Sequence, residues 1–229
     1  MTNKNKNGIF FVIDGTDGSG KKTQTDLLVA RLKKEGYEVE VADFPQYGKK
    51  SAGMVEEYLS GKYGTAQEVG PYRASILYAV DRFDASFKIK KWLNEGKIVI
   101  SNRYVTANMG HQGGKIPTSG ERETFFKWLY ELEYKIFEIP KPDLNIILHV
   151  PAEIGQSLVD NKGRRDYIGE KKRDLHEADI GHLKNAEIVY MEIANNFSDI
   201  IIIECAPGNN ILPKEKIHEL IFKAIQNMI

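Results

Sequence analysis

The chain carries the sequence IFFVIDGTDGSGKKT at residues 9–23. An apolar run suited to a buried strand passes through a glycine-rich segment into a stretch with helical spacing. Loops in this context bind phosphates, because the glycines let backbone N–H groups converge and the helix N-terminus adds its dipole. The residues predicted to hold the phosphates of a nucleotide are Gly15, Thr16, Asp17, Gly18, Ser19, Gly20, Lys21, Lys22 and Thr23.

One position departs from the usual phosphate-loop pattern. Lys21 stands where the lysine that reaches the β- and γ-phosphates is expected, but the Ser or Thr that normally follows and holds Mg²⁺ is Lys22. Thr23 does not simply restore the pattern, since adjacent residues on a helix point about 100° apart. The loop therefore predicts nucleotide binding with altered metal use, and a glycine-rich turn without a ligand is the alternative.

Short apolar runs alternate with longer segments of helical spacing along the rest of the chain. This alternation predicts a parallel sheet with helical crossovers. Strands are expected at residues 9–13, 37–42, 98–100, 146–150 and 200–203. Helices are expected at residues 23–34, 51–59, 72–94, 120–138, 178–196 and 213–228.

Composition excludes several classes of protein. The 229 residues fit a single domain over residues 1–229, and 32 Lys and Arg balance 32 Asp and Glu to a net charge of zero. A chain without net positive charge does not attract nucleic acid or an anionic membrane over its whole surface, so neither is an expected partner. A single cysteine, Cys205, excludes an internal disulfide framework, and no apolar run is long enough to span a bilayer. We expect a cytoplasmic protein.

Two further short motifs follow predicted strands: Phe44-Pro45 and Asn102-Arg103-Tyr104. Tyr78 and Arg82 lie on one predicted helix, and Asp17 lies within the loop. Together they resemble the thymidylate kinase family. The resemblance implies a three-layer α/β P-loop kinase fold, with a five-stranded parallel sheet of order 2-3-1-4-5 and helices on both faces. It also implies a homodimer that transfers the γ-phosphoryl of ATP to dTMP with Mg²⁺, giving dTDP for dTTP synthesis.

The resemblance assigns Phe44 and Pro45 to the dTMP site and four further residues to its base. Tyr78 would stack on the thymine and Arg82 would bind its O4, because residues four apart share a helix face. Asn108 and Gln112 also share a face, and their amides offer a donor and an acceptor to the N3–H and O4 edge. The alternatives are a packed surface pair for Tyr78 and Arg82, and a capping Asn and a solvated Gln for the amides.

The sugar and phosphate of dTMP are assigned in the same way. Asp17 would accept a hydrogen bond from the 3′-hydroxyl, and Arg103 would bind the phosphate through two parallel hydrogen bonds. Many relatives carry a Tyr where this chain has His111, so His111 is expected to meet the sugar at C2′. The alternative is that His111 packs against Tyr104 or a neighbouring helix.

Metal binding departs from the family pattern at a second position. The acid that normally begins the strand-end motif and helps to hold Mg²⁺ or its water is replaced by Asn102. Asp14, at the end of the first predicted strand, is the remaining candidate for an outer-sphere Mg²⁺ partner.

Residues 161–173, NKGRRDYIGEKKR, occupy the lid position of the family. Relatives with Gly at the position of Gly18 supply their catalytic arginine from the lid, and the candidates here are Arg164, Arg165 and Arg173. Such a cation stabilises charge on the transferring phosphoryl and contributes about 10³-fold or more in rate. A solvated loop charge is the alternative for each arginine alone.

Three other functions remain as alternatives. Another nucleoside monophosphate kinase would share the loop and the general fold. A nucleotide-binding homologue with weakened catalysis would explain Lys22 and Asn102 together. A signalling GTPase is a third possibility, but the Asn-Lys-x-Asp motif that reads guanine is missing from the sequence.

Overall fold

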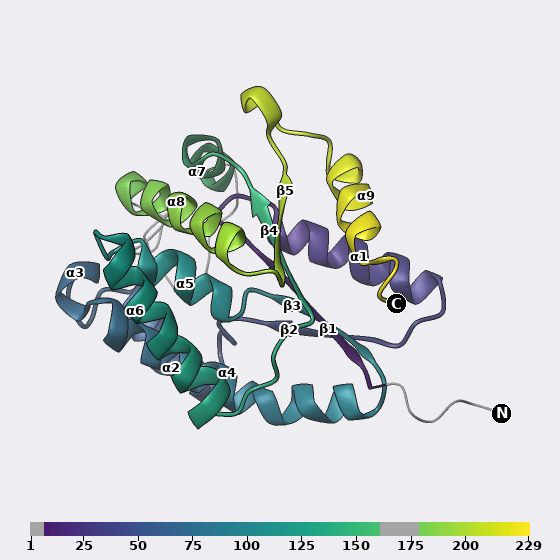
Figure 1. Ribbon diagram of the computed structural model, residues 1–229, viewed down its shortest axis with the longest axis horizontal. Coiled ribbons are helices and arrows are strands. Elements are labelled where there is room, and N and C mark those ends of the chain that lie inside the picture. The colour runs from purple at the N-terminus through teal and green to yellow at the C-terminus, as the bar shows by residue number, and fades with distance from the viewer. Residues whose placement is uncertain (1–6, 161–178) are drawn as a thin grey trace.

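The computed structural model describes residues 7–160 and 179–229. Within them, five strands form one parallel sheet in the order β2-β3-β1-β4-β5, and helices cover both of its faces (Figure 1). This arrangement confirms the predicted fold class and strand order. The strands are β1 (Ile9–Asp14), β2 (Val39–Asp43), β3 (Ile98–Asn102), β4 (Leu144–His149) and β5 (Ile200–Glu204).

The central strand β1 is buried on both sides. Phe10, Phe11, Val12 and Ile13 are each 0 % exposed, so side chains on both faces of the strand are covered. A continuous apolar run of this kind is typical of a parallel sheet packed between two layers of helices. The strand therefore fixes where the phosphate loop begins.

One face of the sheet is covered by α1 (Lys21–Lys34) and α9 (Lys214–Ile225), on the right of Figure 1. The helix α9 buries Ile217, Ile221 and Ile225, whose spacing of four places them on one side of the helix. They pack with Leu28 and Leu32 of α1 in one hydrophobic cluster. This layer holds α1, and with it the phosphate loop, against the sheet.

The opposite face carries α4 (Pro71–Asn94), α5 (Val105–Gly113), α6 (Ser119–Tyr130) and α8 (Ile180–Asn196). The helices α5 and α8 approach closely at Gly110. A Cβ atom at Gly110 would lie 2.6 Å from the ring of Tyr190, so a larger residue would push the helices apart. This contact brings the side chains of both helices to the same end of the sheet.

Several elements differ from the sequence prediction. The helix expected at residues 120–138 is an α-helix followed by a π-helix, η2 (Glu131–Ile136), and periodicity alone does not reveal that change in hydrogen bonding. The helix expected at residues 51–59 begins with a short 3₁₀ turn, η1 (Lys50–Ala52), before α2 (Gly53–Leu59). The sequence prediction omitted α3 (Ala66–Val69), α7 (Ala152–Asp160) and the 3₁₀ turn η4 (Pro207–Asn209).

The carboxyl ends of the three strands β1, β2 and β3 meet at one edge of the sheet. Asn102 pairs in register with Asp43 on one side and with Ile13 on the other. The backbone N–H of Arg103 continues the ladder by donating to the carbonyl of Ile13 at 2.9 Å. The polar residues that follow these strands are therefore neighbours, as expected for ligand sites in open α/β sheets.

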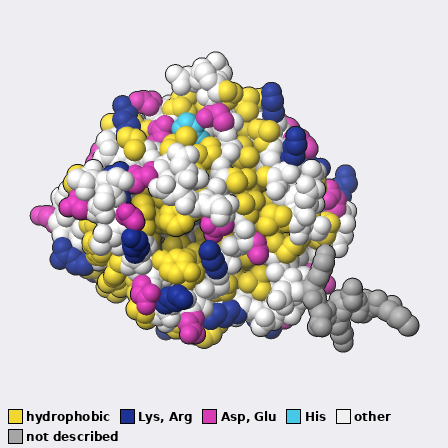
Figure 2. Space-filling view, viewed as in Figure 1, with side chains coloured by type: hydrophobic (Ala, Val, Ile, Leu, Met, Phe, Trp, Pro, Cys, Tyr) yellow, Lys and Arg dark blue, Asp and Glu magenta, His cyan; other side chains and the backbone are white. Residues whose placement is uncertain are grey.

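Hydrophobic side chains also reach the surface. Figure 2 shows them gathered at the lower left of the face, over the region where Figure 1 places α4 and α6. Within residues 7–160 and 179–229, no helix has both the length and the apolar composition that crossing a membrane requires.

Candidate active site

The phosphate loop is shaped by two glycines. Gly20 has φ of 87° and caps the N-terminus of α1, whose first turn contains no acidic residue. The positive end of the helix dipole is therefore not opposed by a nearby carboxylate in that turn. Gly18 also has positive φ, and a Cβ atom there would lie 2.0 Å from the carbonyl oxygen of Gly155 in α7. The close packing of the loop on α7 thus requires glycine at position 18.

The two lysines of the loop have different surroundings. The Nζ of Lys21 donates to the carbonyls of Gly15 at 3.1 Å and Thr16 at 2.8 Å, and its side chain is 8 % exposed. This folds the ammonium over the loop. The side chain of Lys22 is 72 % exposed and donates to the carboxylate of Asp26, one turn along α1, at 3.1 Å. The role predicted for Lys22 on the nucleotide stays a prediction.

Arg103 is the central cation of the site. It follows β3 with φ of 65°, a left-handed conformation that costs a non-glycine residue on the order of 1 kcal/mol. Its guanidinium is bound by Asp17, lies 3.9 Å from Asp14 and contacts His111 Nε2 at 3.0 Å. Burial alone would lower the pKa of Arg103, but the Asp17 and Asp14 carboxylates raise it above its usual value. The side chain is a permanently charged anchor for an anion.

His111 lies between Arg103 and a second histidine. Its Nδ1 is 3.3 Å from Nε2 of His182 in α8. Because a guanidinium only donates, Nε2 of His111 accepts from Arg103, and the ring carries its proton on Nδ1 to donate to His182. Burial, reinforced by the charge of Arg103, lowers the pKa of His111 well below its usual value, and burial lowers that of His182 to about 4. Both rings are therefore neutral near pH 7.

The placement of His111 bears on the two possibilities left open by the sequence: its packing is seen, and its contact with the sugar stays a prediction. Its ring packs against α8, at 5.5 Å from the ring of His182 and 5.9 Å from that of Tyr190, yet it also lines the cavity described below. His182 was not predicted as part of the site. No local spacing connects it to His111, which lies 71 residues earlier in the chain.

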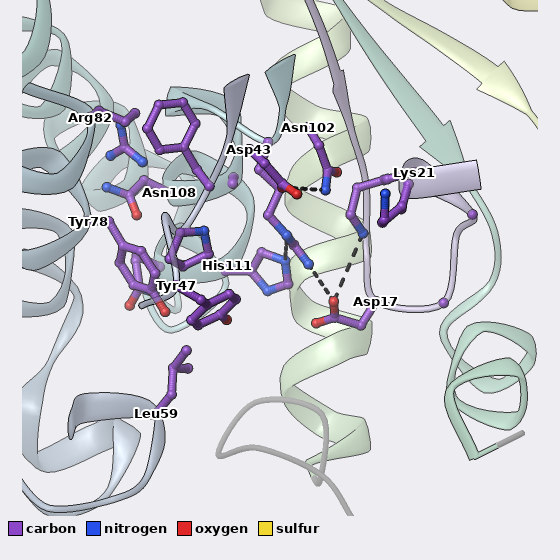
Figure 3. Close-up of a pocket in the computed structure, with 18 of the residues that line it drawn as sticks. Asp17, Lys21, Asp43, Tyr47, Leu59, Tyr78, Arg82, Asn102, Asn108 and His111 are labelled. Carbon is purple, nitrogen blue, oxygen red and sulfur yellow. Dashed lines mark hydrogen bonds and ion pairs between the residues drawn. The ribbon is translucent and has the colours of Figure 1, made fainter. Parts of the chain in front are cut away.

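The residues predicted to meet the base gather at the other end of the same cavity, together with two more residues assigned to dTMP. Tyr78 and Arg82 come from α4, Asn108 and Gln112 from α5, and Phe44 and Pro45 from the segment after β2. Figure 3 shows Tyr78, Arg82 and Asn108 on one side, with Asp17 and Lys21 across the cavity. The exposed fractions of Arg82, Asn108 and Gln112 are 2 %, 2 % and 1 %. A surface pair and a solvated glutamine are therefore wrong as descriptions of these positions.

Arg82 is held by a buried carboxylate that the sequence analysis missed. Its Nε donates to the two carboxylate oxygens of Glu133 at 3.1 and 3.0 Å, and Glu133 is 0 % exposed within η2. Burial would lower the pKa of Arg82, but the charge of Glu133 raises it. The pair thus fixes a charged guanidinium at the base end of the cavity.

A second unpredicted carboxylate lies at the end of β2. Oδ1 of Asp43 accepts a hydrogen bond from Nδ2 of Asn102 at 2.7 Å, and both residues line the cavity. Burial raises the pKa of Asp43, although the bond from Asn102 opposes this. The Oδ1 of Asn102 is buried and has no hydrogen-bond partner among the described residues. The sequence did contain one indication that Asp43 belongs to the site, because Asp43, like Asp14, directly follows a predicted strand.

Asp14, unlike Asp43, lies outside the lining of the cavity. It is 0 % exposed. Its Oδ1 accepts from the N–H of Gly15 at 2.8 Å and the hydroxyl of Tyr190 at 2.9 Å, while its Oδ2 accepts from Thr106 at 2.7 Å. Both oxygens accept hydrogen bonds from the protein, and the outer-sphere magnesium role of Asp14 stays a prediction.

The cavity has a volume of ≈ 460 Å³. Of the predicted loop residues, Gly15, Thr16 and Ser19 do not line it. Arg164, Arg165 and Arg173, with the whole of the predicted lid at residues 161–173, lie outside the described residues. The lining residues are Asp17, Gly18, Gly20, Lys21, Lys22, Thr23, Asp43, Phe44, Pro45, Tyr47, Leu59, Tyr78, Arg82, Asn102, Arg103, Ala107, Asn108, His111 and Gln112.

A phosphate loop that opens into one cavity with a buried arginine and a buried amide pair, at the carboxyl edge of this sheet, defines a P-loop kinase. A family model for thymidylate kinase matches residues 13–215 of the chain. The chain belongs to the thymidylate kinase family.

Individual proteins agree with this assignment. The thymidylate kinase of Mycobacterium tuberculosis is 28 % identical over 187 residues, which cover 81 % of this chain and 86 % of that protein. A probable thymidylate kinase of Thermococcus kodakarensis is 32 % identical over 203 residues, covering 84 % and 91 %. A solved structure of thymidylate kinase from Candida albicans matches with a TM-score of 0.74 at 21 % identity, covering 96 % of this chain and 92 % of that one. At that identity the likeness bears on the fold alone.

The buried Arg82–Glu133 pair generates a stability prediction. Glu133→Leu should lower the free energy of unfolding by about 3–5 kcal/mol, because it leaves the Arg82 charge buried without compensation. Adding Arg82→Met should recover a large part of this loss, since no uncompensated charge then remains. Urea denaturation of both variants and the wild type measures these differences. A double variant as unstable as Glu133→Leu alone would show that the ion pair is not the source of the cost.

Proposed function

We propose that this chain transfers the γ-phosphoryl of ATP to dTMP, giving dTDP for dTTP synthesis. The observation that carries the proposal is the single cavity that joins the phosphate loop, Arg103 and the buried Asn108–Gln112 pair in a member of this family. Two phosphorylated substrates must meet end to end, with the base of one held away from the reacting phosphates. The two ends of the cavity suit this arrangement.

The phosphate end binds charge and aligns the acceptor. Lys21 and the loop amides bind the β- and γ-phosphates of ATP, while Arg103 binds the phosphate of dTMP. An oxygen of that phosphate forms the bond to the γ-phosphorus as the bond to the leaving ADP oxygen breaks. Because the acceptor oxygen is already anionic, the protein needs no general base, and catalysis rests on positioning and charge stabilisation. Asp17 accepts from the 3′-hydroxyl of the sugar.

The residues present fit an Mg²⁺ ion carried by the phosphates of ATP. Among the described residues, no group of three or more His, Cys, Asp and Glu side chains could hold a metal on its own. Mg²⁺ in such enzymes keeps several waters and takes only one or two protein carboxylates. The carboxylate of Asp43, which lines the cavity, is the protein oxygen that would face it. When bound, the ion neutralises phosphate charge.

The Asp43–Asn102 pair also bears on the alternative of weakened catalysis. That alternative rested on the replacement of an acid by Asn102 and of a hydroxyl by Lys22. Asp43 offers a carboxylate on the neighbouring strand, in register with Asn102, so an acid is still available at this edge. We therefore favour an active enzyme. The lid arginines 164, 165 and 173 remain the proposed source of the additional catalytic cation.

A panel of nucleoside monophosphates tests the function. With ATP and Mg²⁺, ADP release should be fastest with dTMP, slower with dCMP, dAMP and dGMP, and absent when Mg²⁺ is removed. Arg103→Met should lower kcat/KM for dTMP by about 10²-fold, equivalent to roughly 2–3 kcal/mol for lost charged hydrogen bonds.

Arg122→Met is the matched control for this assay. Arg122 pairs with Glu192, and its side chain is 14 % exposed against 17 % for Arg103, but it does not line the cavity. It should leave kcat/KM unchanged within about twofold. A preference for dAMP, dGMP or dCMP would identify another monophosphate kinase, and nucleotide binding without turnover would support the weakened homologue. Either result would overturn the proposal.

The homodimer implied by the family resemblance is part of this proposal. The helix α4 exposes an apolar stripe at residues 76, 80, 83 and 87, whose spacing of three and four places it on one side of the helix. The exposed fraction of Phe87 reaches 63 %. A continuous apolar face of this kind suits pairing with the same helix of a second copy.

Sedimentation velocity tests the dimer. Phe87→Glu should convert the protein to monomers, because a charge would have to be buried in the shared face. Ile188→Glu, at a site on α8 with 60 % exposure, is the control and should leave the association state unchanged. A monomeric wild type, or a Phe87→Glu variant that remains dimeric, would contradict the assignment of this surface.

A further inference from the structure

Lys115 lies directly behind the base end of the cavity, just after α5. Its Nζ donates to Oε1 of Gln112 at 2.6 Å and to the hydroxyl of Tyr58 at 2.7 Å. It does not line the cavity itself. The residue therefore acts on a bound base only through the side chains that it holds.

The contact with Lys115 fixes which end of the Gln112 amide faces the cavity. A lysine ammonium has three donors and no acceptor, so only the oxygen of the amide can face it. The amide nitrogen of Gln112 is then left to point the other way. No described residue accepts a hydrogen bond from Nε2, and Gln112 lines the cavity. Gln112 thus presents a donor to the base.

The neighbouring amide is fixed with the opposite polarity. Nδ2 of Asn108 donates to the backbone carbonyl of Ser75 at 3.2 Å, which leaves its Oδ1 as an acceptor toward the cavity. An acceptor beside a donor matches a base edge in which an N–H group lies next to a carbonyl. The N3–H and O4 of thymine form such an edge, whereas cytosine presents the reverse pattern at N3 and its amino group.

Lys115 also supports the residue predicted to stack on the base. Tyr58 is 0 % exposed, and its ring meets that of Tyr78 edge to face, with centroids 6.3 Å apart at an angle of 88°. The hydrogen bond from Lys115 to the Tyr58 hydroxyl holds that ring in place. One ammonium group therefore positions both the edge-reading amide and the ring beneath the stacking Tyr78.

We infer that Lys115 is a specificity-determining positioning residue, which makes the cavity select a pyrimidine with a carbonyl at C4 over one with an amino group. This inference rests on the proposed function, since it concerns the same base site. It assigns the choice between thymine and cytosine to a side chain that never contacts the base.

The protonation state of Lys115 offers a readout that a purely structural residue would not give. Burial lowers the pKa of Lys115 to about 7, and the groups that face it are Tyr58 from α2, Gln112 from α5 and His182 from α8. Below that pH the ammonium only donates. Above it, the neutral amine both donates and accepts, so the orientation of Gln112 is no longer fixed.

The direct test is the ratio of kcat/KM for dTMP over dCMP. In Lys115→Met, the KM for dTMP should rise about tenfold while kcat changes by less than about twofold, and the ratio should fall about tenfold. Lys115→Arg keeps a donor that stays charged and should retain the wild-type ratio. Lys127→Met, at an exposed lysine paired with Glu123 on α6, is the control and should change nothing.

Two further measurements keep the inference falsifiable if Lys115→Met is unstable. Gln112→Glu removes the donor and should raise the KM for dTMP about tenfold, whereas it would be tolerated if the oxygen already faced the base. In the wild type, the dTMP to dCMP ratio should decline between pH 6 and pH 8.5. In Lys115→Arg the dTMP to dCMP ratio should stay level over the same range, because the arginine side chain stays charged at every pH tested.

The outcomes separate this inference from the function on which it rests. A wild type without preference for dTMP would overturn the proposed function. A wild type that prefers dTMP, together with an unchanged ratio in Lys115→Met or a tolerated Gln112→Glu, would overturn the role of Lys115 and leave the function standing.

Discussion

The buried carboxylate of Asp14 joins the parts of the site that the chain brings from distant positions. It ends the central strand, is 0 % exposed, and accepts hydrogen bonds from the phosphate loop, α5 and α8. Removing a carboxylate from water is costly unless hydrogen bonds and charge compensate it. Three donors and the guanidinium of Arg103 at 3.9 Å provide that compensation. Because the buried charge needs all of these donors, Asp14 holds the phosphate loop against the helices that complete the site.

The two ends of the cavity are held rigid by different means. At the phosphate end, Arg103 adopts left-handed backbone geometry and is bound by Asp17 and by a neutral His111. At the base end, the buried ion pair of Arg82 with Glu133 and the fixed amides leave few alternative arrangements. Prepositioned groups of this kind suit phosphoryl transfer, in which alignment and electrostatics supply most of the rate.

The sequence predicted the fold and much of the cavity, because those features leave local signals. The apolar run before the glycine-rich loop and the spacing of Tyr78 and Arg82 can be read from neighbouring residues. Glu133, His182 and Asp43 could not be found in this way. Each meets its partner across the sheet edge or between helices distant in sequence, and Glu133 lies in a π-helix that periodicity reads as an ordinary helix. The roles of the described site residues, and of the lid arginines outside the described residues, stay predictions.

The affinity of the Asp14→Asn variant for dTMP, measured by titration calorimetry, tests the central claim that this carboxylate organises the site. An asparagine keeps the shape of the side chain but loses the negative charge beside Arg103, and its amide nitrogen can no longer accept the hydrogen bond that one carboxylate oxygen of Asp14 accepts. The account predicts a protein that still melts cooperatively but binds dTMP about tenfold more weakly, because the loop, Arg103 and α5 lose their common anchor. A folded variant that binds dTMP as tightly as the wild type would contradict it.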